Sequence, residues 1–189
     1  HWDTLSREVL GGFDLAGAVC GMMPEGCEAA VDLGCGTGIV LERMRGRARQ
    51  IIGVDGSPRM LELSRRRLAG VEGEPEGVSL RIGELSHLPL RDCEADFASI
   101  NMVLHHLSNP ENALAEIRRV LRPGGLLVVA DFDRHTQERM RLDYGDLWLG
   151  FDEATMSRLL QAASFEVVST ARHLVEQGLA LNLTLARRL

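Results

Sequence analysis

An acid and three closely spaced glycines stand out in the stretch Val-Asp-Leu-Gly-Cys-Gly-Thr-Gly at residues 31–38. An apolar run precedes this stretch, and the apolar residues that follow it repeat at helical spacing. A second apolar run, residues 51–54, ends at another acid, Asp55. A strand, a glycine turn, a helix and an acid-ended strand are typical of one half of a nucleotide-binding βαβ unit.

The glycine spacing and the position of the first acid restrict what this turn can bind. Sites for nicotinamide dinucleotides usually space their glycines G-x-G-x-x-G, so that a helix N-terminus holds the pyrophosphate. Here Gly34, Gly36 and Gly38 are closer together, and the Asp32 carboxylate would repel a pyrophosphate and attract a cation. Asp55 is placed to accept both ribose hydroxyls. The alternative interpretation is a tight turn in an α/β protein that binds no nucleotide.

Five segments carry a resemblance to a known family across roughly residues 29–132. With these segments in this order, the chain resembles class I S-adenosylmethionine-dependent methyltransferases, in particular the type 11 and type 25 domains. The resemblance implies an α/β, Rossmann-like fold with a seven-stranded sheet in the order 3-2-1-4-5-7-6, strand 7 antiparallel, and helices on both faces. The segments are VDLGCGTG (31–38), GVDGSPRML (53–61), GELSHLPL (83–90), ADFASINMVLHHL (95–107) and RVLRPGGLLVVADF (119–132).

The same resemblance implies S-adenosylmethionine as the cofactor, with S-adenosylhomocysteine as its product, and a set of binding residues. Asp32 is expected to bind the amino group and Asp55 the ribose, while Gly56 and Met60 flank the adenine. Glu84, where the family often has Asp, is expected to accept from the adenine amino group. Backbone donation from Leu85 to the ring and a contact of Asn101 with the methionine part complete the site. The predicted cofactor-binding residues are Asp32, Gly34, Cys35, Gly36, Gly38, Asp55, Gly56, Met60, Glu84, Leu85 and Asn101.

Two consecutive histidines, His105 and His106, follow the predicted fourth strand. Ligands of α/β sheets bind at the carboxyl ends of the strands, so an imidazole there could deprotonate an acceptor thiol, phenol or carbon acid. Both residues are therefore the predicted catalytic candidates. The alternative interpretation gives them a structural part.

The segment 132–151 follows the fifth strand and is the predicted acceptor side of the site. It is similar, more loosely, to methyltransferases fused to or associated with ArsR-type repressors. The candidates that could line a substrate pocket are His135, Arg139, Tyr144 and Trp148. The alternative is a lid helix packed by Trp148 and Phe151. Trp2 and Phe13 could cover the donor from the N-terminal side, with core packing equally plausible.

Composition bounds the protein class. The chain has 189 residues, so one domain is expected, with an N-terminal helical cap at 1–28 and a single methyltransferase domain at 29–189. The formal net charge of −6 disfavours a nucleic-acid partner for this chain alone. The four cysteines form no C-x-x-C pair, so no metal site is expected. No signal peptide or membrane span is visible, so a cytoplasmic location, no membrane partner and a monomer or homodimer are expected.

Periodicity and turn residues predict the order of the elements. The Pro123–Gly124–Gly125 turn is expected to stop the helix that begins near Asn109–Pro110. Two late strands joined by a short loop predict an antiparallel closing hairpin. Helices are expected at 3–23 (interrupted near Gly11–Gly12), 37–46, 58–68, 110–122 and after Asp152, and strands at 29–34, 50–55, 78–82, 97–102, 126–131, 165–170 and 179–186.

The predicted function is transfer of a methyl group from S-adenosylmethionine to a small-molecule acceptor. Two alternatives remain open. The first is a C-methyltransferase of the type found in ubiquinone and menaquinone synthesis, since the HHL and RVLRPGG segments look alike. The second is an S-adenosylmethionine-binding sensor module of an ArsR-type transcriptional regulator, since the chain begins with His1 and something upstream is expected to be missing. A nicotinamide oxidoreductase is a distant third, opposed by the glycine spacing and Asp32.

Overall fold

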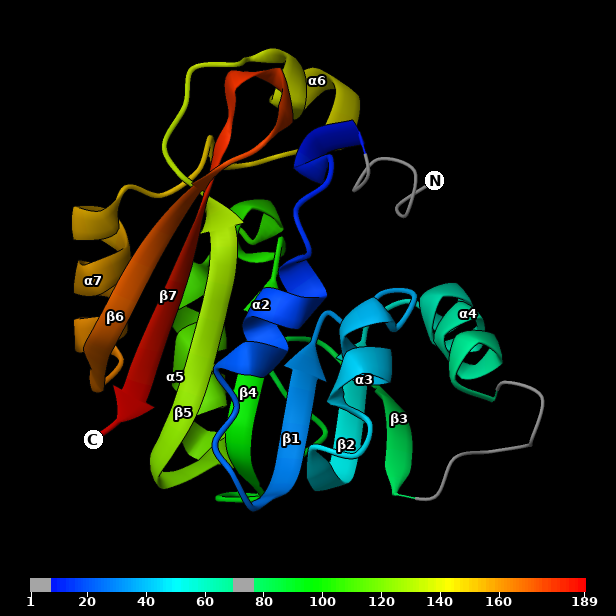
Figure 1. The fold of residues 1–189 in the computed structure, drawn as a ribbon. Helices are drawn as coiled ribbons and strands as arrows, with labels where there is room; N and C mark the ends of the chain where they lie inside the picture. Colours follow the sequence, from blue (N-terminus) through cyan, green and yellow to red (C-terminus); the bar gives the residue numbers. More distant parts are fainter. Residues whose placement is uncertain (1–7, 70–76) are drawn as a thin grey trace.

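A single seven-stranded sheet organises the chain, with strand order β3-β2-β1-β4-β5-β7-β6 (Figure 1). The computed structural model describes residues 8–69 and 77–189. All neighbours from β3 to β5 are parallel, while β7 runs antiparallel to both β5 and β6. This confirms the predicted fold and strand order. The strands are β1 Cys27–Leu33, β2 Ala48–Asp55, β3 Val78–Ile82, β4 Ala95–Asn101, β5 Leu121–Phe132, β6 Phe165–Leu174 and β7 Ala180–Arg188.

Helices cover both faces of the sheet (Figure 1). On one face lie α2 (Leu15–Gly21), α3 (Ile39–Met44) and α4 (Pro58–Ala69), and on the other lie α5 (Pro110–Val120) and α7 (Glu153–Ala162). Neighbouring strand residues serve opposite faces: Ala30 packs with the first group of helices and Val31 with the second. Burial on both sides explains why the central strands are nearly all apolar.

Capping residues begin the helices where the sequence predicts. The Asn109 side chain accepts from the Asn112 backbone N–H, with Pro110 as the first helical residue, and Asp152 accepts from Thr155. Ser57 accepts from the Met60 N–H at the start of α4. Several predicted bounds nevertheless need correction.

The Pro123–Gly124–Gly125 turn does not stop α5, contrary to the prediction. The helix already ends at Val120, and the turn lies inside β5. Leu121 pairs with Ala95 of β4 and Leu126 with Phe97, so residues 122–125 make an excursion between two paired positions. Gly124 has φ +78°, a backbone conformation that glycine adopts without strain.

Two predicted helices are shorter than expected. The first glycine-loop helix begins at Ile39 rather than residue 37, because Gly38 precedes it with φ +83°. At the N-terminus, Gly11 with φ +59° separates helical residues 8–10 from α2, which spans only Leu15–Gly21. Residues 1–7, with Trp2, lie outside the described residues. Within the described part of the chain, no helix has both the length and the apolar character needed to span a bilayer.

Candidate functional site

A cavity of about 670 Å³ opens at the carboxyl edge of the sheet. The loops that follow β1, β2, β3 and β4 form its walls, so it lies where α/β sheets bind ligands. Eight residues predicted from sequence line it: Gly34, Gly36, Asp55, Gly56, Met60, Glu84, Leu85 and His106.

A second hollow of about 190 Å³ adjoins the first, since Gly34 and Met102 line both. It contains three further predicted donor residues, Asp32, Cys35 and Asn101, and is bordered by Phe13 from the N-terminal segment. The predicted donor set thus divides between two adjoining hollows. The glycine turn lies between them.

Gly38 lines neither hollow. A glycine is needed there for packing against α4. A Cβ atom at Gly38 would lie 2.4 Å from Ser64 Oγ in α4, and the backbone has φ +83°. This glycine therefore allows α3 to start next to α4. Gly34, by contrast, borders both hollows and meets Val103, whose Cγ2 would be 2.7 Å from an added Cβ.

The Asp55 carboxylate at the end of β2 is held by two backbone donors. The Gly36 N–H donates to Oδ2 and the Ser57 N–H donates to Oδ1, both at 2.8 Å. Each carboxylate oxygen can accept more than one hydrogen bond, so both remain able to accept from a neighbouring diol. The bond from Gly36 also joins the glycine turn to the second strand.

Asp32 and Asn101 form a buried polar pair at the ends of β1 and β4. Asp32 Oδ1 accepts from Ser99 Oγ at 2.6 Å and from Asn101 Nδ2 at 2.9 Å. Burial raises the pKa of the Asp32 carboxyl to about 7, although these two hydrogen bonds favour its charged form. Asn101 Oδ1 is buried and accepts no hydrogen bond from the described residues. The pair therefore offers an unfilled acceptor beside a carboxylate, which suits an ammonium group.

Residues after β3 close the far side of the larger cavity. Glu84 pairs with His87 in an isolated bridge, with the His87 N–H donating to the Glu84 carbonyl at 3.0 Å. The Glu84 side chain is exposed at the mouth of the cavity, while Leu85 packs against the core. Together with Met60, these residues form a wall that is polar at its rim and apolar beneath.

The two histidines lie in a 3-10 helix, η1 (Leu104–His106), but only His106 lines the cavity. The His105 side chain is 2% exposed, and its Nδ1 lies 2.6 Å from Asp131 Oδ1. Burial alone would lower the pKa of His105, but the carboxylates of Asp131 and Asp146 outweigh it and raise the pKa. For His106, burial and then the neighbouring His105 lower the pKa.

Two acids near these histidines were missed by sequence reasoning. Asp131 ends β5, in the segment RVLRPGGLLVVADF, and its position at a strand end could have identified it. Asp146 follows the short helix α6 (Arg139–Tyr144), and nothing in its sequence context marks it as a neighbour of η1. It reaches that place because the Leu147 and Trp148 N–H groups both donate to the His105 carbonyl.

The four predicted substrate-side residues line neither hollow. Trp148 Nε1 donates to the Leu107 carbonyl at 2.8 Å, and its ring packs on Phe151, so it anchors the segment to η1. Tyr144 packs against an apolar cluster around Phe132 and Met140. His135 accepts from the Gln137 N–H, and Arg139 donates to the Gln137 side chain. Each of these four side chains thus packs against, or is hydrogen-bonded to, another part of the chain.

The described cysteines are all free thiols, and most are buried. Burial raises the pKa of Cys20 and Cys27 to about 11, and it also raises the pKa of Cys35 in the glycine turn. These thiols are therefore protonated near neutral pH and behave as small apolar side chains.

Comparison with known proteins identifies a matching family and relatives of the chain. Residues 31–129 match the family model described as "Methyltransferase domain", which is just over half of the chain. The chain is 40% identical over 123 residues to an uncharacterized 37.1 kDa protein in transposon Tn4556 of Streptomyces fradiae, covering 64% of this chain and 34% of that protein. It is 31% identical to a demethylmenaquinone methyltransferase of Lactobacillus johnsonii, covering 61% of this chain and 48% of that enzyme.

The fold also matches solved structures. An S-adenosylmethionine-dependent methyltransferase from Mesorhizobium loti superposes with a TM-score of 0.75 at 20% identity, covering 93% of this chain and 99% of that one. At that identity the likeness concerns the fold alone. The chain spans about a third to a half of the length of the two sequence relatives above.

Proposed function

The chain belongs to the S-adenosylmethionine-dependent methyltransferases, and from that premise we propose that it transfers a methyl group to a small-molecule acceptor bound in the larger cavity. The observation that carries this proposal is the pairing of the buried, unfilled acceptor Asn101 Oδ1 with the Asp32 carboxylate, one strand away from Asp55. An ammonium group at the first site and a ribose at the second fit a single nucleoside that carries an amino acid.

The residues that line the two hollows fit that donor in three places. Asp32 and Asn101 bind the amino group, and the Asp55 carboxylate accepts from the ribose hydroxyls, with its orientation already fixed by Gly36 and Ser57. The wall formed by Met60, Glu84 and Leu85 takes the adenine. When bound, S-adenosylmethionine supplies an activated methyl group on a positively charged sulfur.

Methyl transfer is an in-line displacement, so the protein must align the acceptor and exclude water. The apolar part of the cavity, which includes Met102, Val103 and Leu107, provides the surface on which an acceptor packs. A base is needed only if the acceptor keeps its proton at neutral pH. Of the two predicted catalytic residues, His106 has that role in our proposal, since it lines the cavity and His105 does not.

A quinone-type acceptor is the second candidate. The similarity to a demethylmenaquinone methyltransferase and the apolar lining beside His106 both favour it. A quinol ring would pack on Val103 and Leu107, and its hydroxyl would face the imidazole. This candidate makes a stricter claim than the first, because it names a carbon atom as the methyl acceptor.

Calorimetric titration with S-adenosylhomocysteine tests the proposed function. We expect one molecule to bind per chain, in protein whose fold has been verified by circular dichroism. Folded protein that shows no binding heat at several temperatures contradicts the proposal. Incubation with radiolabelled S-adenosylmethionine and a demethylated menaquinol analogue then tests the second candidate. If the product is bound but no label is transferred to the quinol, the quinone candidate alone is rejected.

A further inference from the structure

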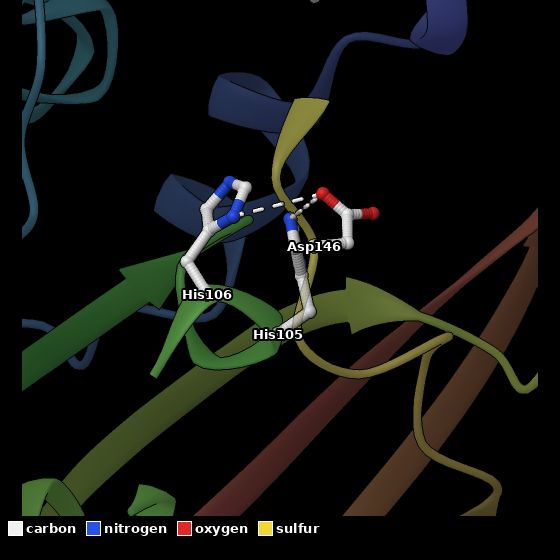
Figure 2. Close-up of side chains that lie close together, drawn as sticks. All are labelled: His105, His106 and Asp146. Carbon is white, nitrogen blue, oxygen red and sulfur yellow. Dashed lines mark ion pairs between the residues drawn. The ribbon is translucent and has the colours of Figure 1, made fainter. Parts of the chain in front are cut away.

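His105, His106 and Asp146 converge on one point beside the larger cavity (Figure 2). Asp146 Oδ1 lies 3.7 Å from His105 Nε2 and 3.6 Å from His106 Nδ1. One donor atom from each residue can be chosen so that all lie within 4.8 Å of one another. The histidines come from η1 after β4, whereas Asp146 comes from the loop after α6.

The Asp146 carboxylate is buried without the hydrogen bonds that burial normally requires. Its side chain is 1% exposed, and neither oxygen has a hydrogen-bond partner among the described residues. Distances of 3.6 and 3.7 Å to the imidazole nitrogens are too long for hydrogen bonds. Buried charges are normally paired closely, hydrogen-bonded or bound to a metal, so this carboxylate calls for a specific partner.

The spacing of the three donor atoms fits a metal ion between them. Nitrogen and oxygen ligands that lie about 2.0–2.2 Å from a tetrahedral Zn²⁺ are separated from one another by roughly 3.3–3.5 Å. The two nitrogen–oxygen distances therefore resemble edges of a coordination polyhedron. Two imidazoles and one carboxylate are also ligands that zinc and similar divalent ions accept.

Asp131 orients His105 for such a role. Its Oδ1 lies 2.6 Å from His105 Nδ1, and the same carboxylate accepts from the Phe132 and His105 backbone N–H groups. When the Nδ1–H group donates its hydrogen bond to Asp131, Nε2 carries the lone pair on the side that faces Asp146. Metal-binding histidines are commonly held in this way by a carboxylate behind them.

We propose that His105 Nε2, His106 Nδ1 and a carboxylate oxygen of Asp146 bind one divalent transition-metal ion, with Zn²⁺ as the reference ion. The sequence predicts no metal site, because its cysteine pattern lacks one and because Asp146 is far from the histidine pair in the chain. His106 also lines the larger cavity, so the ion lies next to the space for the acceptor.

An ion at this position changes how an acceptor is activated. An acceptor thiol or hydroxyl that coordinates the ion through sulfur or oxygen ionises at lower pH and releases its proton to water. A metal-free His106 would instead take that proton itself. Activity that survives complete removal of the metal would therefore assign the proton transfer to the imidazole. Metal binding itself is independent of the proposed function and is measured without methyl donor.

Zn²⁺ titration of chelator-stripped protein, in competition with a chromophoric chelator, tests the site. We expect one tightly bound ion per chain, bound at least about 100-fold more weakly in Asp146→Asn. Asp131→Asn is expected to bind Zn²⁺ about 10- to 100-fold more weakly, the usual effect of removing the group that orients a ligand histidine. The matched control is Asp143→Asn, an exposed acid in α6, which should bind as the parent does.

Two further measurements separate this site from other thiols and from misfolding. Bound Co²⁺ should give visible absorption bands that disappear in His106→Ala and remain in Cys93→Ser. The circular dichroism spectrum and the thermal unfolding of Asp146→Asn should resemble those of the parent, which establishes that the variant is folded. Folded parent protein that binds no Zn²⁺, or binding that is equal in the parent and in Asp146→Asn, overturns the proposal.

Discussion

The donor side and the acceptor side of the cavity are built in different ways. On the donor side, the Asp55 carboxylate accepts from the backbone N–H groups of Gly36 and Ser57, which belong to the turns after β1 and β2. Around η1, three segments far apart in the chain meet, and the Asp146 carboxylate has no hydrogen bond from any described residue. The orientation of Asp55 is therefore fixed without a ligand, whereas Asp146 is left for a ligand to satisfy.

The largest effect is expected at Asp32, a donor-side carboxyl group whose charged form is destabilised by burial. Its pKa is raised to about 7 in the fold from 3.8, so the folded state holds the proton that the unfolded state loses between pH 4 and pH 7. Stability contributed by the protonated form is therefore present at low pH and is lost as pH rises through this window.

We expect the unfolding free energy of the parent, relative to Asp32→Asn, to fall by roughly 2–4 kcal/mol from pH 4 to pH 7 and then to stay level. Urea unfolding at several pH values measures this difference. Asp143→Asn, an exposed control, should show a nearly constant difference. A difference for Asp32→Asn that rises with pH would mean that the carboxylate is stabilised by its hydrogen bonds more than it is destabilised by burial.

The next largest effect is expected at Asp55, and it concerns the affinity for S-adenosylhomocysteine and not the stability of the fold. Asp55→Ala removes acceptors for the ribose hydroxyls and should weaken S-adenosylhomocysteine binding by roughly 1–3 kcal/mol, the scale of hydrogen bonds to a charged group. Isothermal titration calorimetry measures the change, with Asp143→Ala as the control. Unchanged affinity in folded Asp55→Ala would refute the ribose assignment.

Substitution of Gly38 tests whether this glycine of the turn is needed for packing and not for donor binding. Gly38→Ala should lower stability by roughly 1–3 kcal/mol, since it combines a positive φ with a clash against Ser64. Gly46 has a similar φ of +76° but open space around its added Cβ, so Gly46→Ala isolates the backbone strain. Thermal unfolding should rank Gly38→Ala as the less stable. Equal stabilities would show that the contact with Ser64 costs nothing.

The smallest effect is expected at Trp148, on the acceptor side, and it concerns stability. Trp148→Phe loses the hydrogen bond to the Leu107 carbonyl and should cost about 0.5–1.5 kcal/mol of stability. Donor affinity should stay the same, because Trp148 lines neither hollow. Leu142→Ala, at a side chain 85% exposed, is the control and should be close to neutral. A large loss of donor affinity in Trp148→Phe would show that the two sides are coupled.

The same contrast explains what sequence could predict. The strand order was implied by the family resemblance and is confirmed. The positions of the glycine turn and Asp55 at the cavity could be predicted from sequence, because these residues are close in the chain and follow consecutive apolar strands. The packing role of Gly38 could not be predicted, since it depends on Ser64 in another helix. Pro123–Gly124–Gly125 predict a helix stop, although they form the excursion within β5, because proline and glycine suit both structures. Asp146 could not be found, since its neighbours are set by the path of residues 133–151 over η1.

The inserted strand β7 has a consequence for how the chain is made. Strands β6 and β7 are consecutive and pair with each other, and β7 alone joins that hairpin to β5 (Figure 1). During synthesis, every residue of the donor and acceptor sides leaves the ribosome before this hairpin can dock. Until then the outer edge of β5 is unpaired, and open strand edges invite pairing between chains. Once the hairpin has docked, the edge strand on this side is no longer the largely buried β5 but β6, which carries the charged residues Glu166 and Arg172.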